Sequence, residues 1–264
     1  MRANYKKMGL DCLFTLGGAG THRTAALLCA EGCNVIGLPK TIDNDIYGTD
    51  VTFGFHTAVD VATEAIDRVR TTAASHGRTI LVEVMGNKAG WLTLYTGIAA
   101  GAEVILLPEI PFNIDKVCEA VLRNYEKGKP CNVIAVAEGA VLDSEAAYKK
   151  KERAFVRTER GETTVTTHLA EEIGERTGVE TRSTVLGYIQ RGGNPSAYDR
   201  VLSSRLGSFA GKLAAEGRFG VTVAVAGREI TFNALPEIAG KYKLVRPDSQ
   251  IVHSAEDIGV CLGR

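Results

Sequence analysis

The sequence lacks an excess of either charge, because 31 lysine and arginine residues balance 31 aspartate and glutamate residues. Without net charge, no overall field attracts nucleic acid or an anionic membrane, so a small anion would have to be held by local arginines. The sequence also lacks an apolar run of membrane-spanning length. Its first residues, Met1 to Lys7, lack the apolar core of a signal peptide. We therefore expect neither a nucleic-acid nor a membrane partner.

Cysteine and histidine are present but not grouped. The six cysteines include no CxxC pair, and the five histidines are scattered along the chain. A structural zinc site needs its Cys and His ligands at short, regular spacings, so this pattern argues against one. We expect reduced, mostly buried thiols in a cytoplasmic protein.

The chain also lacks internal repeats and low-complexity linkers, and 264 residues can bury a full core as one large domain or two lobes. Short, β-branched apolar runs alternate with helical patterns. This alternation predicts an α/β fold, doubly wound, with mostly parallel sheets and helices on both faces. Strands are predicted at 12–16, 34–38, 79–84, 104–107, 132–137 and 221–225, and helices at 53–75, 115–126 and 166–176. The charged segment 149–160 is interpreted as a solvated insertion rather than a nucleic-acid patch.

A polar segment, Pro39-Lys40-Thr41-Ile42-Asp43-Asn44-Asp45, follows the predicted strand 34–38. Open α/β sheets place their chemistry just beyond strand ends. One carboxylate of such a pair can take a proton from a substrate hydroxyl, while the other shapes the local field or faces a metal. The alternative is a turn whose Asp and Asn side chains satisfy backbone donors and start the next helix.

A glycine-rich segment, Leu16 to Thr21, lies between the first predicted strand and a helix. Glycines let backbone N–H groups approach phosphate oxygens, and a helix N-terminus favours negative charge. An ordinary strand-to-helix connector is the alternative interpretation.

Three further polar clusters are present, and two of them directly follow predicted strands. The segment 84–91 (VMGNKAGW) follows one strand, and Glu138 ends another, where it could accept hydrogen bonds from sugar hydroxyls. Arg182 and the glycine-flanked Arg191 suit bidentate capture of a phosphate. The alternatives are a tight turn, simple exposure and surface salt bridges. Taken together, the clusters indicate a phosphorylated, sugar-like ligand.

The motifs PKTIDND, GGxGT, VEVMGNKAGW, the Ala-Glu-Gly strand tip and LGYIQRGGNPSAYDR together resemble the 6-phosphofructokinase family, in the same order from about Leu13 to about Arg205. The resemblance implies a two-lobed α/β fold. It also implies phosphoryl transfer to the 1-hydroxyl of fructose 6-phosphate, giving fructose 1,6-bisphosphate in glycolysis. The donor in this family is ATP with magnesium or, in some members, pyrophosphate.

The resemblance assigns roles to individual residues. Asp43 matches the general base, with Thr41, Asp45 and Lys40 beside it. The donor phosphates would be held by Gly18, Ala19, Gly20 and Thr21. Contacts to the sugar substrate would come from Thr41, Ile42, Asp43, Met85, Gly86, Asn87, Glu138, Tyr188, which stands where many relatives have His, and Arg191. Arg78 and Arg182 match arginines that reach the sugar-phosphate site of a neighbouring subunit, which implies a homo-oligomer with shared active sites.

Four positions depart from the family pattern or bear on the donor. Ala19 replaces the usual Asp of GGDG, which helps to hold Mg²⁺, so we expect Mg²⁺ use with a rate loss on the order of 10²-fold or more. Asn87 replaces the Arg usual after Met-Gly. Gly20 leaves room for a nucleotide, whereas Lys40 is common in pyrophosphate users but also occurs in some ATP users. We favour ATP over pyrophosphate.

Family members begin well upstream of this GGxGT turn, so we expect an incomplete first lobe. The remnant of the donor lobe is predicted at 1–54 with 190–245, and the sugar-phosphate lobe at 55–189 with 246–264. The alternative to an active enzyme is a catalytically impaired or non-catalytic relative that binds sugar phosphate or pairs with a complete subunit. A fragment that does not fold alone is a further alternative.

Overall fold

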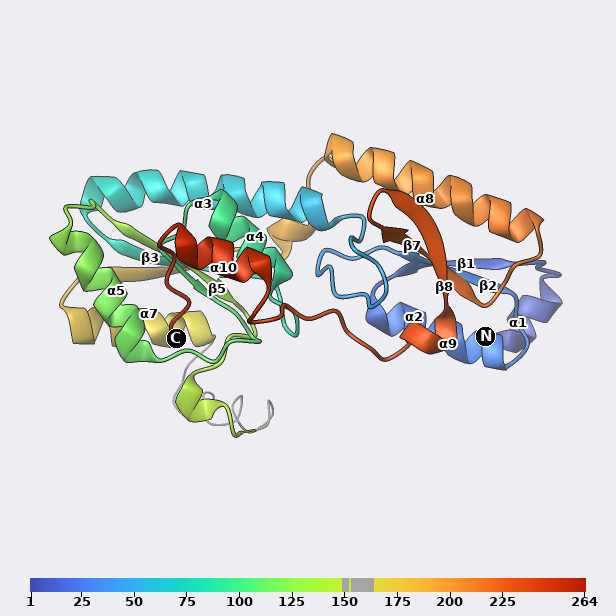
Figure 1. Cartoon of the computed structure of the whole chain (residues 1–264), viewed down its shortest axis with the longest axis horizontal. Coiled ribbons are helices and arrows are strands. Elements are labelled where there is room, and N and C mark those ends of the chain that lie inside the picture. The colour runs from blue at the N-terminus through green and yellow to red at the C-terminus, as the bar shows by residue number, and fades with distance from the viewer. Residues whose placement is uncertain (149–151, 153–163) are drawn as a thin grey trace. The chain divides into compact units, whose positions relative to one another are not determined.

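The computed structural model describes residues 1–148, 152 and 164–264. The chain divides into two compact units (Figure 1), each described here by itself. Unit 1 comprises Met1–Thr57 and Asn194–Lys243, and unit 2 comprises Ala58–Gly193 and Leu244–Arg264. Apart from Glu152, the charged segment 149–160 lies outside the described residues.

Unit 1 contains a four-stranded sheet in the order β1-β2-β7-β8. The first three strands are parallel, and β8 is antiparallel to β7. Helices α2 and α9 cover one face of the sheet and α8 the other (Figure 1). The bounds are α1 Arg2–Lys7, β1 Leu13–Gly17, α2 Ala19–Ala30, β2 Val35–Pro39, α8 Ala197–Ala215, β7 Val221–Ala226, β8 Glu229–Ala234 and α9 Leu235–Ile238.

The two neighbouring strands β1 and β2 differ in exposure. All five residues of β2 are buried, as expected for a parallel strand with neighbours on both sides. The edge strand β1 alternates, and it leaves Phe14 and Leu16 exposed by 42% and 54%. Phe14 and Leu16 therefore leave apolar surface exposed on one side of β1.

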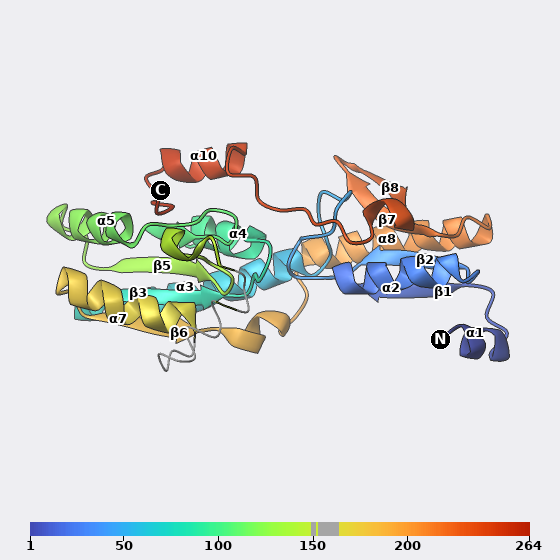
Figure 2. The ribbon, with the colours of Figure 1, turned by 90° about the horizontal axis from the view of Figure 1, so that it is seen from below.

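Unit 2 contains a second four-stranded sheet, in the order β4-β5-β3-β6, and all its neighbouring strands are parallel. Helices α5 and α7 pack side by side on one face (Figure 2), over a core that includes Leu81, Phe112 and Leu169. The bounds are α3 Phe55–His76, which lies in unit 2 from Ala58 onward, β3 Thr79–Val84, α4 Trp91–Ala99, β4 Val104–Leu106, α5 Ile114–Glu126, β5 Asn132–Ala137, η1 Asp143–Glu145, α7 Val165–Thr177, β6 Thr181–Val185, η2 Gly187–Arg191 and α10 Gln250–Asp257.

Local sequence explains how the unit 2 helices begin and end. The Asn113 side chain caps α5 by accepting from the backbone N–H of Asp115, and Thr164 caps α7 by accepting from that of Thr167. Gly178 ends α7 in the left-handed conformation, at φ 70°. These signals are local, which is why the sequence places both helices to within a residue.

The α/β class with mostly parallel sheets and helices on both faces is confirmed. The six predicted strands all form, with bounds that shift by at most one residue. The sequence analysis did not predict β6, β8 or α8. Strand β6 reads Thr-Arg-Ser-Thr-Val, so its polar residues hide it from a search for apolar runs. All six cysteines are free thiols, three of them buried. No helix of the described ranges is long and apolar enough to span a membrane.

Candidate functional site

Unit 1 brings two of the predicted polar segments together, residues 18–21 and residues 40–45, which we call the unit 1 cluster. They meet because β1 and β2 are parallel neighbours whose last residues, Gly17 and Pro39, are paired in register. A Cβ placed on Gly18 would lie 3.5 Å from the Thr41 side chain. Gly18 is the extended N-cap residue of α2, and no side chain in the described structure caps this helix. The first N–H groups of α2 therefore remain without a helical partner beside Thr41.

Thr41 and Asp43 contact each other within the second segment. The Thr41 hydroxyl lies 3.4 Å from Asp43 Oδ2, and it accepts from the Asp43 backbone N–H at 3.2 Å. Thr52 donates its hydroxyl proton to the Thr41 carbonyl at 2.8 Å. Asp43 is half-buried, Asp45 is buried and Lys40 is exposed. A carboxylate with this exposure remains accessible to a substrate hydroxyl.

Asn44 and Lys243 hold the turn that follows Asp43. Asn44 has φ 51°, in the left-handed region that Asn tolerates better than most residues. Its Oδ1 accepts from the Thr52 N–H at 3.1 Å and from Lys243 Nζ at 3.0 Å. Lys243 also donates to the carbonyl groups of Thr49 and Asp50. Burial lowers the pKa of Lys243 to about 8, although the nearby carboxylates of Asp50 and Asp45 oppose the shift. Thus a lysine distant in sequence anchors this turn.

His22 holds the other segment of the unit 1 cluster. It is buried in the first turns of α2, with its Nδ1 3.0 Å from the Gly18 carbonyl oxygen and its Nε2 2.8 Å from Thr222 Oγ1. Burial lowers the pKa of the imidazole, although the Gly18 carbonyl opposes that shift. The neutral ring is therefore favoured at neutral pH.

Unit 2 gathers a second set of predicted residues at the carboxyl ends of β3, β5 and β6. We call this set the unit 2 cluster. It forms there because the three strands are parallel and adjacent, so their carboxyl ends lie at the same end of the sheet. It comprises Met85, Gly86, Asn87, Glu138, Tyr188 and Arg191.

Two polar side chains, the buried Gln190 and the half-buried Glu109, hold backbone in and beside the unit 2 cluster. Gln190 is 1% exposed; its Oε1 accepts from the Met85 N–H at 3.0 Å, and its Nε2 donates to the Gly187 carbonyl at 3.1 Å. Glu109 accepts from the N–H of Gly90 and that of Val245. Burial raises the pKa of Glu109, and these backbone bonds oppose the shift. Both side chains join segments that lie far apart in sequence.

The loops after β3 and β5 pack tightly on each other. Glu138 donates its backbone N–H to the Val84 carbonyl at 2.9 Å, and the Gly139 N–H lies 3.3 Å from the Gly86 carbonyl. A Cβ on Gly139 would lie only 2.2 Å from the Asn87 carbonyl oxygen. Only glycine fits there without moving one of the two loops.

Tyr188 and Arg191 are the exposed members of the unit 2 cluster. Both lie on η2, and the Arg191 guanidinium sits 5.4 Å from the centre of the Tyr188 ring. Tyr188 is 80% exposed. Arg191 is exposed as well, so its guanidinium is accessible to an anionic ligand.

Arg78 and Arg182 do not join the unit 2 cluster. Arg78 precedes β3 and Arg182 is the second residue of β6, so both lie at the amino ends of these parallel strands. The length of β3 separates them from Met85, roughly 20 Å at 3.3 Å per residue. Both pair with Glu180, at 2.8 and 2.7 Å. The hydrogen bond from Arg78 is the main cause of the lowered pKa of the Glu180 carboxyl.

Comparison with known proteins identifies the family. The phosphofructokinase family model matches residues 1–214. The chain belongs to the phosphofructokinase family. An ATP-dependent 6-phosphofructokinase of Spirochaeta thermophila is 51% identical over 260 residues, which is 98% of this chain and 71% of that protein. A pyrophosphate–fructose 6-phosphate 1-phosphotransferase of Amycolatopsis methanolica is 49% identical over 250 residues, covering 94% of this chain and 72% of that protein.

Solved phosphofructokinase structures share the fold. The structure of phosphofructokinase from Saccharomyces cerevisiae matches with a TM-score of 0.76 and 29% identity over 98% of this chain. The chain spans 36% of the length of that yeast chain. The curated relatives are thus named as phosphotransferases that use either of two donors, and both kinds are about equally similar to this chain.

The phosphofructokinase family uses Mg²⁺, so the chain should offer ligand atoms for this ion. In the described parts of the chain, no three His, Cys, Asp or Glu side chains are grouped so that they could hold a metal ion. Mg²⁺ in phosphoryl-transfer enzymes is commonly bound by one or two carboxylates together with substrate phosphates. Asp43 and Asp45 fit that limited demand, whereas Ala19 offers no ligand atom.

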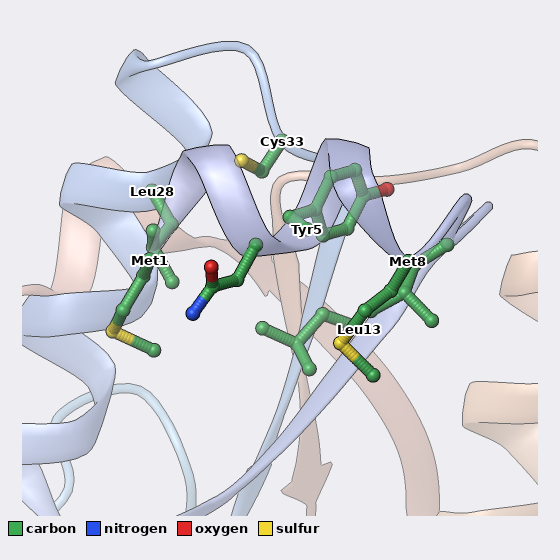
Figure 3. Close-up of a pocket in the computed structure, with 8 residues that line it drawn as sticks. Met1, Tyr5, Met8, Leu13, Leu28 and Cys33 are labelled. Carbon is green, nitrogen blue, oxygen red and sulfur yellow. The ribbon is translucent and has the colours of Figure 1, made fainter.

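An apolar pocket lies in unit 1 beside α1, outside the predicted site (Figure 3). Its lining residues are Met1, Asn4, Tyr5, Met8, Leu10, Leu13, Leu28 and Cys33. None of them was predicted to bind a substrate. The sequence analysis in turn missed His22, Lys243, Gln190 and Glu109, because each acts through a partner that only the fold brings near.

Proposed function

We propose that this chain transfers a phosphoryl group to the 1-hydroxyl of fructose 6-phosphate, with ATP or pyrophosphate as donor. The observation that carries the proposal is the unit 1 cluster, where the glycine-rich start of α2 lies against Thr41 and next to the Asp43 carboxylate. Phosphoryl transfer needs little covalent chemistry from the protein. It needs a positioned donor, a base for the acceptor hydroxyl and charge neutralisation.

In this proposal Asp43 is the general base that accepts the proton of the sugar hydroxyl. The Thr41 hydroxyl, which contacts both the carboxylate and the backbone N–H of Asp43, orients that carboxylate. The first N–H groups of α2, from Ala19 to Thr21, bind donor phosphate oxygens at the positive end of the helix. Mg²⁺, when bound with the donor, neutralises phosphate charge.

The unit 2 cluster would bind the sugar phosphate. Arg191 supplies the charge for the 6-phosphate, Glu138 accepts from sugar hydroxyls, and the Met85–Gly86 backbone lies against the sugar. Support comes from the location of these residues at the carboxyl ends of parallel strands, where α/β proteins bind ligands.

Arg78 and Arg182 support a proposal about assembly. They lie at the amino ends of the unit 2 strands, whereas the other sugar-binding residues lie at the carboxyl ends. One chain therefore cannot use all of these residues on one sugar phosphate. We propose that they serve the site of a neighbouring subunit in a homo-oligomer. Turnover would then depend on protein concentration near the dissociation constant of the oligomer, and analytical ultracentrifugation alongside the assay tests this.

ATP remains the favoured donor in this proposal. A Cβ on Gly20 would meet no atom within 4 Å, so no side chain occupies the space directly beside this part of α2. The similarity to one relative named for ATP and another named for pyrophosphate does not discriminate between the donors.

A coupled assay of fructose 1,6-bisphosphate formation, with Mg²⁺ and with ATP and pyrophosphate in separate reactions, tests function and donor together. We expect turnover with ATP above that with pyrophosphate. Turnover only with pyrophosphate would contradict the donor assignment. No turnover with either donor, in protein shown to be folded by circular dichroism, would contradict the enzymatic proposal.

Ala19 favours a second candidate, a relative that binds sugar phosphate without efficient transfer. The methyl group of Ala19 packs against the apolar cluster under α2 that contains Ala25 and Leu28, and it provides no oxygen for Mg²⁺. Ala19→Asp separates the candidates. A rate increase on the order of 10²-fold would indicate that only the metal ligand is missing. If neither wild type nor Ala19→Asp shows turnover while both bind fructose 6-phosphate, the result would favour the binding protein.

A further inference from the structure

His22 is buried in unit 1 and makes two specific hydrogen bonds that its neighbours in the sequence do not predict. All five histidines lie in the described residues, and His22 alone is buried, with 2% of its surface exposed. Both ring nitrogens have a hydrogen-bond partner, one on the loop before α2 and one on β7. A buried imidazole with two specific partners holds a defined orientation.

The two contacts determine which nitrogen carries the proton. A carbonyl oxygen can only accept, so His22 Nδ1 must be the donor to Gly18. In the neutral ring Nε2 then accepts, and the Thr222 hydroxyl donates to it at 2.8 Å. The other acceptor near that hydroxyl is the Val223 carbonyl, at 3.5 Å, which is a much weaker competitor.

The sheet leaves space for this chain of hydrogen bonds at one glycine. Thr222 is the register partner of Gly37 on β2. A Cβ on Gly37 would lie 2.9 Å from Thr222 Oγ1 and 3.2 Å from His22 Nε2. The Thr222 side chain and the His22 ring therefore meet over Gly37, and β7 becomes linked to the Gly18 peptide at the end of β1.

The linked peptide lies at the start of the predicted donor loop. Gly18 accepts from both His22 Nδ1 and the His22 backbone N–H, the latter at 3.1 Å. Holding this carbonyl inside the unit directs the next N–H groups, those of residues 19–21, outward from the helix start. Because glycines flank Ala19 on both sides, this backbone has little intrinsic stiffness and depends on such a contact.

We propose that His22 is a positioning residue for the donor-phosphate loop, acting through the Gly18 carbonyl and oriented by Thr222. The proposal rests on the proposed function, since it assumes that residues 18–21 bind the donor. His22 itself would touch neither substrate. Its removal would weaken donor binding and leave sugar binding intact.

Three substitutions at position 22 separate positioning from packing. Asn can place its amide nitrogen near the position of Nδ1, so His22→Asn retains the donor to Gly18. His22→Gln reaches toward Thr222 instead, and His22→Ala provides neither contact. We expect His22→Gln and His22→Ala to raise the donor KM by roughly 10-fold, the effect of one lost hydrogen bond. We expect His22→Asn to stay within about 3-fold, and the fructose 6-phosphate KM of all three to stay within about 2-fold.

His253→Asn on α10 is the matched control, because this histidine is exposed and its ring contacts the neighbouring Glu256 on the same helix. An unchanged donor KM in His22→Ala would overturn the proposal. So would an equal rise of both KM values in all three variants, because that pattern indicates a general packing role.

Nitrogen NMR of ¹⁵N-histidine-labelled protein gives a readout independent of activity, and its main result needs only the wild type. We expect a protonated-type resonance for Nδ1 and an unprotonated-type resonance for Nε2 of His22, with a shift of the Nε2 signal in Thr222→Val. A proton on Nε2 instead would overturn the inference even in an active enzyme. Wild-type protein that neither turns over nor binds MgATP or magnesium pyrophosphate in calorimetry would overturn the proposed function, and with it the donor role of His22.

Discussion

Unit 1 and unit 2 hold their polar clusters by different means. In unit 1 two basic side chains, His22 and Lys243, donate to backbone carbonyl groups, and burial lowers the pKa of both. In unit 2 a carboxamide, Gln190, and a carboxylate, Glu109, accept from backbone N–H groups instead. The residues that would meet the substrate also differ, because those of unit 2 include the exposed Tyr188 and Arg191.

This difference has a physical reason. In the proposed function, the unit 1 cluster presents backbone N–H groups and one carboxylate, so its backbone is the part that must be held in place. In the same proposal, the unit 2 cluster also presents long side chains, Tyr188 and Arg191, from the short helix η2, and Gln190 fixes the peptide at Gly187, where this helix begins. Variants that affect one unit alone should therefore separate donor binding, catalysis and sugar binding.

The largest expected effect comes from Asp43→Asn in unit 1. Loss of the general base should lower kcat by about 10²- to 10⁴-fold, while the KM values change little, because the amide cannot accept the hydroxyl proton. The coupled assay measures this. Asp11→Asn, an exposed carboxylate in the same unit, is the control and should leave kcat unchanged. Wild-type turnover in Asp43→Asn would contradict the mechanism.

The next effect is expected from Gly139→Ala in unit 2. Its methyl group would lie 2.2 Å from the Asn87 carbonyl oxygen, so the loops after β3 and β5 must move apart. We expect a loss of about 1–3 kcal/mol in the free energy of unfolding and weaker sugar binding. Urea denaturation followed by circular dichroism measures the first of these.

The matched control for this glycine is Gly211→Ala on α8. No atom lies within 4 Å of a Cβ there, so the helix should gain about 0.5–1 kcal/mol. Equal stability of the two variants would show that the unit 2 loops are not tightly packed.

Gln190→Leu is expected to affect sugar binding by a smaller factor. The Met85 N–H and the Gly187 carbonyl would both lose their partner in a buried place. We expect the fructose 6-phosphate KM to rise roughly 10-fold and the donor KM to stay within 2-fold. Gln250→Leu, on the exposed start of α10, is the control. A rise in the donor KM alone would contradict the division of roles between the units.

The last prediction concerns charge in unit 1: the contribution of Lys243 to stability should depend on pH, by a small amount per pH unit. Its pKa is about 8 in the folded chain and near 10.5 when unfolded, so between these values the unfolded state binds more protons. This contribution to stability is therefore present above pH 10.5 and is lost as the pH falls to 8. The difference in unfolding free energy between wild type and Lys243→Met should rise with pH in this window, by on the order of 1 kcal/mol per pH unit. A difference independent of pH would contradict the shifted pKa.

Much of the fold could be predicted from the sequence, because its signals are local. The apolar run 132–137 becomes β5 without change, and Asn113 and Gly178 mark the ends of helices. Strands β6 and β8 could not be predicted this way. Strand β6 is polar, and β8 is half-exposed beside β7, so the hydrogen bonds of their neighbours rather than their own apolar residues define them.

In the candidate site, too, some residues could be predicted from local sequence and others could not. Local motifs indicated the residues that would meet a substrate, such as Asp43, Glu138 and Arg191, because phosphoryl chemistry requires particular side chains at strand ends. The roles assigned to them remain proposals. The residues that hold these segments carry no motif, since they are identified by a partner and not by a pattern.

By itself, the sequence determined the α/β class, the strand-end motifs and the family, all of which depend on residue type and short spacing. Only the tertiary structure decided that Thr222 would orient His22, 200 residues away in sequence, or that Lys243 would hold the turn after Asp43. It also decided that Arg78 and Arg182 lie at the amino ends of the unit 2 strands, whereas Arg191 lies beyond their carboxyl ends. The physical reason is that a hydrogen bond depends on distance and direction in space, and parallel strands bring together positions that the order of residues leaves far apart.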